Sequence, residues 1–179
     1  MPEYVEEFPA GDGLDLLNHT GGAVSVIEGL DIISAPIPDM EQAIIIENRR
    51  NEPGTATGQG QPIRADWMRQ RVIQGGAPIP EQIADRLRNR EFATFDDFRG
   101  AFWKEVASDP RLAGQFNRQN VIRMADGLAP FAPPRTQVGD RSRFELDHIK
   151  PLFRGGDVYN VENLQIMTPS DQIEKTRSD

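Results

Sequence analysis

The sequence predicts an α+β fold, in which a helical body is followed by a small C-terminal unit of two strands and one helix. Apolar residues recur at the helical spacing of three and four between about residues 80 and 124. Apolar and polar residues instead alternate on both sides of a Gly155-Gly156 pair, as they do in half-buried strands. The 179 residues suffice for one domain of ordinary size with a short appendage.

The helical body is expected to follow a short strand. A run of three isoleucines makes residues 43–46 the first predicted strand, and a turn-rich stretch at residues 48–54 comes after it. A helix is expected over about residues 80–90, because Pro80 suits a first helical position and apolar residues recur every fourth position around it.

Two further helices complete the predicted body. Thr94 followed by Asp97 has the form of a capping box, and an apolar stripe continues from it at helical spacing through Phe95, Phe98, Phe102 and Val106. We interpret this stripe as core rather than as a platform on which bases stack. Asn117 is expected to cap the last helix of the body, which ends at Gly127 and turns three side chains inward, namely Val121, Ile122 and Met124.

The C-terminal unit is predicted to begin after Gly139. Residues 141–147 and residues 163–168 both alternate as strands do, and Pro169 begins a terminal helix whose basic residues lie in its last turn. A unit this small buries little apolar surface, so a bound metal ion would help to hold its shape.

Composition excludes several classes of protein. The mean hydropathy is −0.54 and no apolar run approaches the ~20 residues that span a bilayer, so no membrane-spanning segment is expected. The chain has no cysteine, which excludes disulfides, thiolate nucleophiles and zinc ribbons. Its two histidines, His19 and His148, exclude a site with three histidine ligands. His19 lies in the N-terminal segment and is expected to have no role.

Charge divides the chain into two parts. The net charge is −8, yet residues 1–48 hold ten of the 28 acidic residues and none of the 20 basic ones. We therefore interpret residues 1–42 as an acidic linker or the remnant of an upstream domain, and residues 43–179 as the functional domain. The first residues lack the basic and apolar regions of a secretory signal, so export by the general route is not expected.

Several blocks of the sequence resemble one known family. The residues Asp147-His148-Ile149-Lys150-Pro151, then Gly155-Gly156, then Asn163-Leu164-Gln165, resemble the HNH motif, also called the ββα-metal motif. Earlier blocks occur in the same order as in the cytotoxic DNase domain of E-group colicins and S-type pyocins, namely residues 50–58, 95–103, 129–132 and 144–146. A lone Asp-His pair would be weak support, whereas ordered agreement over about residues 43–179 is specific.

The resemblance implies a metal-dependent endonuclease that hydrolyses DNA with little sequence preference. His148 is the expected general base, because an imidazole with a pKa near ~6.5 can accept a proton from water at neutral pH. By the resemblance, Asn163 braces the loop that carries this base, and Arg50 and Arg141 hold phosphate oxygens. Glu145 is expected to orient one of the two arginines.

The metal site departs from the family pattern. Bacteriocin DNases carry two metal-binding histidines on the terminal helix, and this chain has Gln172 and Thr176 at those positions. The resemblance makes Asp147 the first ligand, and we expect Gln172, with Asp171 as a substitute, to complete a site for one divalent ion. Oxygen ligands favour Mg²⁺ over Zn²⁺ or Ni²⁺. Gln172-Ile173-Glu174-Lys175 is also close to the Asn-x-x-Lys arrangement of broader HNH nucleases.

The expected partners are DNA and a small acidic immunity protein. Phe131 lies between prolines, where it is either a lid over the core or an anchor for a partner, and the resemblance favours the anchor. The resemblance also implies a released bacterial toxin that acts in the cytoplasm of a target cell. The loss of the helix histidines keeps one alternative open, a degenerate module that binds DNA or an immunity protein without cleaving.

Overall fold

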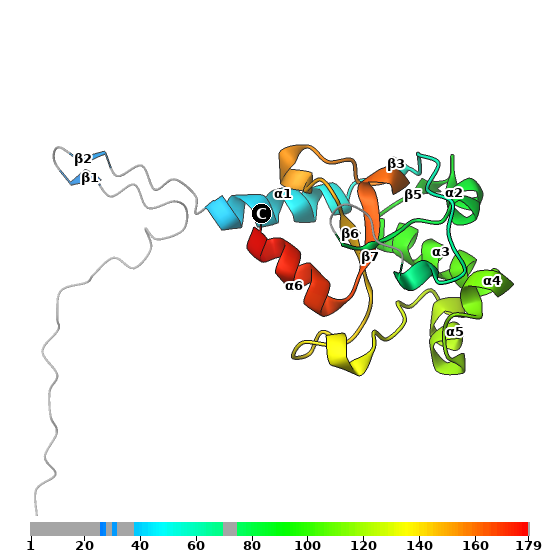
Figure 1. Cartoon of the computed structure of the whole chain (residues 1–179). Helices are drawn as coiled ribbons and strands as arrows, with labels where there is room; N and C mark the ends of the chain where they lie inside the picture. Colours follow the sequence, from blue (N-terminus) through cyan, green and yellow to red (C-terminus); the bar gives the residue numbers. More distant parts are fainter. Residues whose placement is uncertain (1–25, 28–29, 32–37, 70–74, 179) are drawn as a thin grey trace, which may run out of the picture. The chain divides into compact units, whose positions relative to one another are not determined.

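The computed structural model describes residues 26–27, 30–31, 38–69 and 75–178 (Figure 1). It divides into two compact units, residues 1–40 and residues 41–179. In the first unit, β1 (Val26–Ile27) pairs in antiparallel fashion with β2 (Leu30–Asp31). Within the described ranges, no helix combines the length and the apolar character needed to cross a membrane.

The predicted strand at residues 43–46 is wrong, because these residues lie inside helix α1 (Pro38–Arg50). A proline at the first helical position and Arg49 and Arg50 in the last turn are favourable helix signals, and they outweigh the β-propensity of three isoleucines. Ile44 is 55% exposed while Ile46 packs against the core, the one-sided burial of a surface helix.

The body of the second unit is helical, as predicted, with three short strands between its helices. Its elements are β3 (Gly54–Thr55), the 3₁₀ helix η1 (Trp67–Arg69), β4 (Ala77–Pro78), α2 (Glu81–Leu87), β5 (Glu91–Phe92), α3 (Phe95–Ser108), α4 (Pro110–Ala113) and α5 (Arg118–Ala125). β3 and β5 form an antiparallel pair. The α3 helix packs against α2, α4 and α5 and so forms the centre of the body.

Local signals position these helices. The Thr94 hydroxyl accepts a hydrogen bond from the Asp97 N–H, and the Asp97 carboxylate accepts one from the Thr94 N–H, which confirms the capping box. The whole predicted stripe on α3 is buried, and Asn117 caps α5 as predicted. The inward placement of Ile122 is wrong, since its side chain is 55% exposed; Met124 alone of the three is fully buried.

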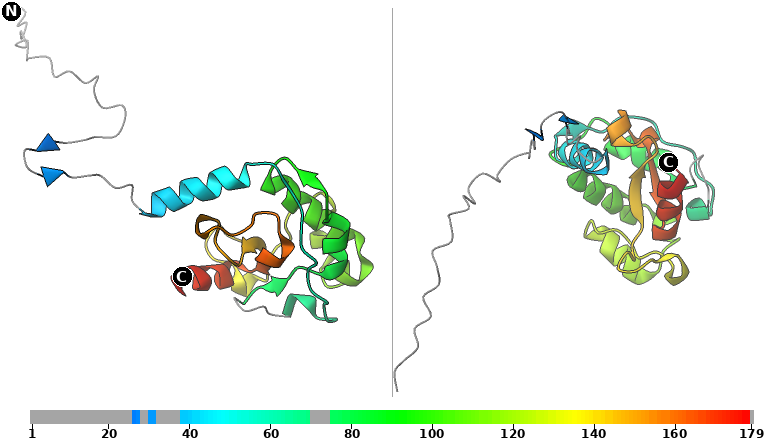
Figure 2. Two further views of the ribbon diagram at one scale, coloured as in Figure 1. Left: turned by 90° about the horizontal axis from the view of Figure 1, so that it is seen from above. Right: turned by 90° about the vertical axis from the view of Figure 1, so that its left-hand side faces the viewer.

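The C-terminal unit has the predicted strand, loop, strand and helix. β6 (Glu145–His148) is shorter than the predicted strand and reaches one residue further, to His148. The 3₁₀ helix η2 (Pro134–Thr136) precedes β6, and the 3₁₀ helices η3 (Leu152–Arg154) and η4 (Val161–Asn163) follow it. The strand β7 (Leu164–Met167) and the helix α6 (Pro169–Ser178) then complete the unit. The sheet has the order β4-β7-β6 with antiparallel pairing, and α6 lies beside β6 and β7 in both views of Figure 2.

The position of β6 at the edge of this sheet gives its two faces different environments. Every residue of β7 is buried, because β7 lies between β4 and β6. Along β6 burial alternates, so that Leu146 and His148 are buried whereas Glu145 and Asp147 are half-buried. Adjacent residues therefore present a base on one face and a carboxylate on the other.

Candidate active site

His148 is held at the end of β6 by the core of the domain. Its side chain is 6% exposed, and the ring centroid lies 4.8 Å from that of Phe95, at the start of α3. The Nε2 atom lies 3.1 Å from the Val158 carbonyl oxygen. Since a carbonyl only accepts hydrogen bonds, Nε2 carries the proton and donates it, which leaves Nδ1 as the basic nitrogen.

The surroundings keep this imidazole neutral. Burial lowers the pKa of His148 from 6.5 to about 4, a shift that the hydrogen bond to the Val158 carbonyl opposes. Among the charges nearby, the cations of Arg50 and Lys175 lower the pKa further, and the carboxylate of Asp147 raises it. At pH 7 the ring is therefore unprotonated at one nitrogen, the state that a general base requires.

The loop after β6 is fastened by Asn163. Its side-chain oxygen accepts a hydrogen bond from the Lys150 N–H at 2.8 Å, and its amide nitrogen donates to the carbonyl oxygens of Lys150 at 3.2 Å and Asp157 at 2.8 Å. A side chain at Gly156 would collide with the Lys150 carbonyl, so only glycine allows this close passage. The asparagine thus lies where the resemblance expects a brace.

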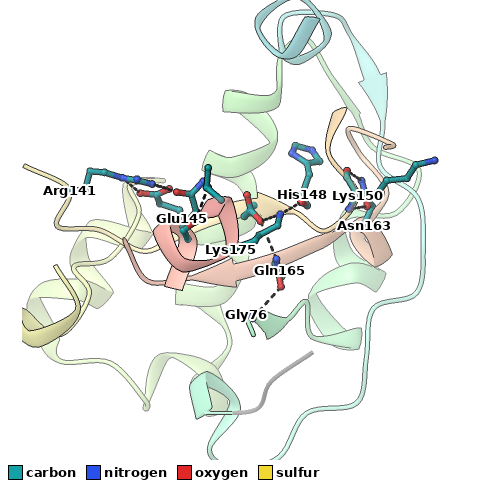
Figure 3. Close-up of polar contacts among 11 residues, drawn as sticks. Gly76, Arg141, Glu145, His148, Lys150, Asn163, Gln165 and Lys175 are labelled. Atoms are coloured by element: carbon teal, nitrogen blue, oxygen red, sulfur yellow. Dashed lines mark hydrogen bonds and ion pairs between the residues drawn. The ribbon is translucent and has the colours of Figure 1, made fainter. Parts of the chain in front are cut away.

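Asp147 faces the other side of β6 and contacts the terminal helix. Its Oδ2 atom accepts hydrogen bonds from Lys175 Nζ at 2.7 Å and from Gln165 Nε2 at 3.0 Å. Lys175 Nζ also donates to the His148 carbonyl oxygen at 2.6 Å. The buried Gln165 accepts a bond from the Gly76 N–H at 3.2 Å. Figure 3 shows the His148 ring pointing away from Lys175 and Gln165.

Gln172 lies apart from this contact, at an arginine. Arg141 forms a two-point ion pair with Glu145, with Nε–Oε1 at 3.0 Å and Nη2–Oε2 at 2.6 Å, and its Nη2 also donates to Gln172 Oε1 at 2.7 Å. Glu145 therefore contacts Arg141, one of the two arginines that it is predicted to orient. Asp171 lies in the first turn of α6, where its N–H donates to Thr168 Oγ1 at 3.3 Å.

Arg50 ends α1 above the ring that supports the base. Its guanidinium carbon lies 5.0 Å from the centroid of the Phe95 ring, and burial lowers its pKa. Its Nε–H group is buried, and no described residue accepts a hydrogen bond from it. The Arg50 side chain is half-buried and lines a cleft, where a guanidinium suits the oxygens of a phosphate.

A cleft of about 480 Å³ runs from Arg50 between α3 and the start of β6. Its charged lining residues are Arg50, Arg99, Arg141, Arg143, Asp96, Asp140 and Glu145. Arginine forks in such a cleft match the geometry of phosphate oxygens. The cleft brings two of the predicted phosphate-binding residues, Arg50 and Arg141, to one cavity.

Phe131 lies away from these groups, in the loop after α5. It is half-buried, and the guanidinium carbon of Arg123 lies 4.3 Å from its ring centroid. Its N–H donates to the Asn120 side chain at 2.8 Å, and its carbonyl accepts from the same amide at 3.1 Å. Its backbone is therefore fixed while part of its ring remains open to solvent.

Three groups at the site were not assigned from the sequence. The Val158 carbonyl has no side-chain signal, so no pattern could indicate it. Gln165 belongs to the quoted motif, yet nothing in its spacing predicts a bond to Asp147. Lys175 carries the strongest signal, because it stands three residues after Gln172 in the Gln-x-x-Lys arrangement, on the helix that must pack against β6.

Three features together define a DNA-cleaving nuclease domain of the HNH type. They are a neutral histidine at a strand end, an arginine-lined cleft beside it and a strand-loop-strand-helix frame. The profile described as "Colicin/Pyocin-S2, DNase domain" matches residues 54–177. The chain belongs to this family of bacteriocin nuclease domains.

Individual relatives agree with this assignment. The chain is 49% identical to colicin-E8 of Escherichia coli over 123 residues, which are 69% of this chain and 60% of that protein. It is 43% identical to pyocin-S2 of Pseudomonas aeruginosa over 131 residues, which are 73% of this chain and 19% of that protein. The chain thus spans less than two thirds of the curated relatives that it matches first.

Two solved structures resemble the fold. The pyocin AP41 DNase-immunity complex contains a chain that matches with a TM-score of 0.68 at 41% identity, covering 72% of this chain and 100% of that one. The mutant nuclease domain of pyocin S8, solved with its cognate immunity protein, matches with a TM-score of 0.66 at 45% identity, covering 69% of this chain and 98% of that one.

Membership of a nuclease family suggests a metal cofactor, but the residues present do not fit a divalent ion. Asp147 already accepts an ammonium, and the Gln172 oxygen accepts the Arg141 guanidinium. The Thr176 hydroxyl donates to the Gln172 carbonyl oxygen at 2.9 Å. Nowhere in the described part of the chain do three histidine or acidic residues gather in a group that could hold a metal.

Proposed function

We propose that residues 43–179 form a DNase domain that hydrolyses phosphodiester bonds with His148 as the general base. The single observation that carries this proposal is the bond from His148 Nε2 to the Val158 carbonyl, since it leaves Nδ1 basic on a ring that is neutral at pH 7. As the oxygen of a water molecule bonds to phosphorus, its proton passes to Nδ1. The bond from phosphorus to the leaving oxygen breaks, and that oxygen takes up a proton from solvent.

The arginines supply the contacts to the phosphate. Arg50 lines the cleft, and Arg141, which Glu145 binds at two points, lines the same cleft. Contacts of this kind position a DNA backbone without reading bases, which supports cleavage with little sequence preference. Asn163 keeps the base in place by fastening the loop between Lys150 and Asp157.

The sequence favours Mg²⁺ over Zn²⁺ or Ni²⁺ as a single divalent ion, because its proposed donors are the oxygens of Asp147, Gln172 and Asp171. Such an ion would have to compete with the Lys175 ammonium for Asp147. Calorimetric titration with each ion measures whether that ion binds in competition with Lys175.

Plasmid cleavage tests the proposal. The purified chain is incubated with supercoiled plasmid in Mg²⁺, in Mn²⁺, in Ni²⁺, in Zn²⁺ and in chelator, beside a His148→Ala variant. Nicking by the chain and loss of nicking by the variant support the hydrolytic role. DNA binding without nicking in every buffer would instead support the degenerate module.

A partner and a cellular role follow for the longer protein. We propose that the domain belongs to a bacteriocin toxin that acts in the cytoplasm of a target cell, and that an acidic immunity protein blocks it. The half-buried Phe131, with Arg123 over its ring and the exposed Ile122 and Leu128 of the same region, is the proposed anchor. Phe131→Ala should weaken binding of the cognate immunity protein by at least ~2 kcal/mol in calorimetry, whereas Arg135→Ala should not.

A further inference from the structure

The face of β6 opposite His148 holds a lysine where the family pattern expects a metal ion. Lys175 Nζ lies 2.7 Å from Asp147 Oδ2 and 2.6 Å from the His148 carbonyl oxygen. We propose that this ammonium takes the place of the divalent ion and supplies the positive charge that the scissile phosphate meets. The inference rests on the proposed function, because it concerns the same hydrolysis.

The ion pair is largely shielded from solvent but is not completely enclosed. The side chains of Lys175 and Asp147 are only 9% and 17% exposed. Burying two charges costs free energy unless further hydrogen bonds satisfy them. Gln165 provides such a bond to Asp147, and the Gly76 N–H in turn fixes the Gln165 amide. Four residues thus form one continuous polar chain from Gly76, the residue before β4, to α6.

The ammonium retains a donor for a substrate. A lysine ammonium has three N–H bonds, and the described contacts of Lys175 use two of them, to Asp147 and to the His148 carbonyl. The third can donate to a phosphate oxygen. Its bond to the His148 carbonyl oxygen holds the ammonium at the residue that carries the base.

The same contact disfavours a second cation. An ion bound at Asp147 would face the lysine charge across the same carboxylate, and the like-charge repulsion would be large in a site that excludes water. Removing the lysine charge should free the carboxylate. The chain is thus expected to bind divalent ions poorly, and a Lys175→Met variant, which keeps the bulk without the charge, should bind them better.

Two measurements test the inference. In calorimetry with Mn²⁺ alone, the wild-type chain should show no binding at millimolar ion, and Lys175→Met should show measurable binding. In the plasmid assay, the wild-type chain should nick in chelator at a rate close to that in Mg²⁺, while Lys175→Met should lose about 10²-fold in chelator. Arg177→Met, on the same helix, is the matched control and should leave both results unchanged.

A double variant separates a role at the phosphate from neutralisation of Asp147. If Lys175 only balances that carboxylate, then Asp147→Asn combined with Lys175→Met should nick as fast as the wild type, and the inference falls. If the ammonium acts on the substrate, the double variant should remain about 10²-fold slower. Circular dichroism of each variant confirms that it is folded.

The remaining outcomes are also decisive. Wild-type nicking that disappears in chelator and returns with Mg²⁺, while His148→Ala stays inactive, overturns the lysine role and leaves the proposed function intact. A chain that nicks in no buffer overturns both. Binding of Mn²⁺ by the wild type as tightly as by Lys175→Met likewise contradicts the inference.

Discussion

The two faces of β6 are held in place by different kinds of group. On one face, the His148 Nε2 atom is fixed by a backbone carbonyl, the Phe95 ring packs against the imidazole, and the Asn163 side chain fastens the loop. On the other face, Asp147 is bound by two side chains, those of Lys175 and Gln165. Backbone geometry belongs to the fold, whereas a side chain changes with one substitution. The carbonyl that fixes the tautomer of His148 therefore remains after a substitution at Val158, whereas each partner of Asp147 can be removed by one substitution.

The largest effect should come from the base side. His148→Ala removes the proton acceptor, so the rate of plasmid nicking should fall by about 10²–10⁴-fold, while DNA binding persists. Gel shift with an uncleaved duplex checks binding. The comparison between faces fails if an equally folded Gln172→Ala loses as much.

Acid should destabilise the domain through the same histidine. Because burial lowers the pKa of His148 to about 4, the unfolded chain takes up this proton near pH 6.5 and the folded chain does not. The folded domain therefore loses stability as the pH falls from 6.5 towards 4. Through His148, the free energy of unfolding decreases by about 3 kcal/mol at most.

Urea unfolding between pH 7 and pH 4.5 measures this loss. The difference in unfolding free energy between the wild type and a His148→Gln variant isolates the effect of His148, because His19 and the carboxylates are common to both proteins. Parallel stability curves for the two proteins would contradict the assigned burial. Nicking itself should persist below pH 6.5, since the folded histidine remains unprotonated there.

Asn163→Ala should loosen the base without removing it. The variant removes the bonds to the N–H and carbonyl of Lys150 and to the carbonyl of Asp157, which are exposed and worth about 0.5–1.5 kcal/mol each. Thermal unfolding measures the loss, and nicking should slow as well. Asn160→Ala, which removes a single bond to the Glu162 N–H, is the control for a generic loop change.

The smallest effect is expected on the cation side, at Gln172. Its amide oxygen accepts one exposed bond from Arg141, which Glu145 already holds at two points. Gln172→Ala should therefore slow nicking by less than about tenfold, or ~1.4 kcal/mol. A loss like that of His148→Ala would show that Gln172 serves the reaction itself.

The features that could be predicted from the sequence are local ones. The capping box at Thr94 joins residues three apart, and the burial of Phe98 and Phe102 follows from helical spacing. The ββα frame could be recognised because its turns need particular residues, such as Gly156 and Asn163. The family assignment followed from ordered blocks, and the comparisons confirm it.

The features that escaped prediction depend on neighbours distant in sequence or on competing signals. The isoleucines of residues 43–46 suit a strand or a helix, and the flanking residues of α1 decide between them. The contact of Lys175 with Asp147 joins residues 28 apart and depends on how α6 is rotated against the sheet. The hydrophobic periodicity of a sequence does not predict which helix residue will contact a given carboxylate.

The polar chain from Gly76 through Gln165 and Asp147 to Lys175 has a consequence for how the domain matures. The side-chain amide of Gln165 can take only one orientation, because its oxygen accepts from the Gly76 N–H and its nitrogen donates to the Asp147 carboxylate. If Lys175 takes the place of the divalent ion as proposed, docking of α6 is completed by the polypeptide alone. A bacterium starved of zinc or nickel would still produce the domain in its finished shape.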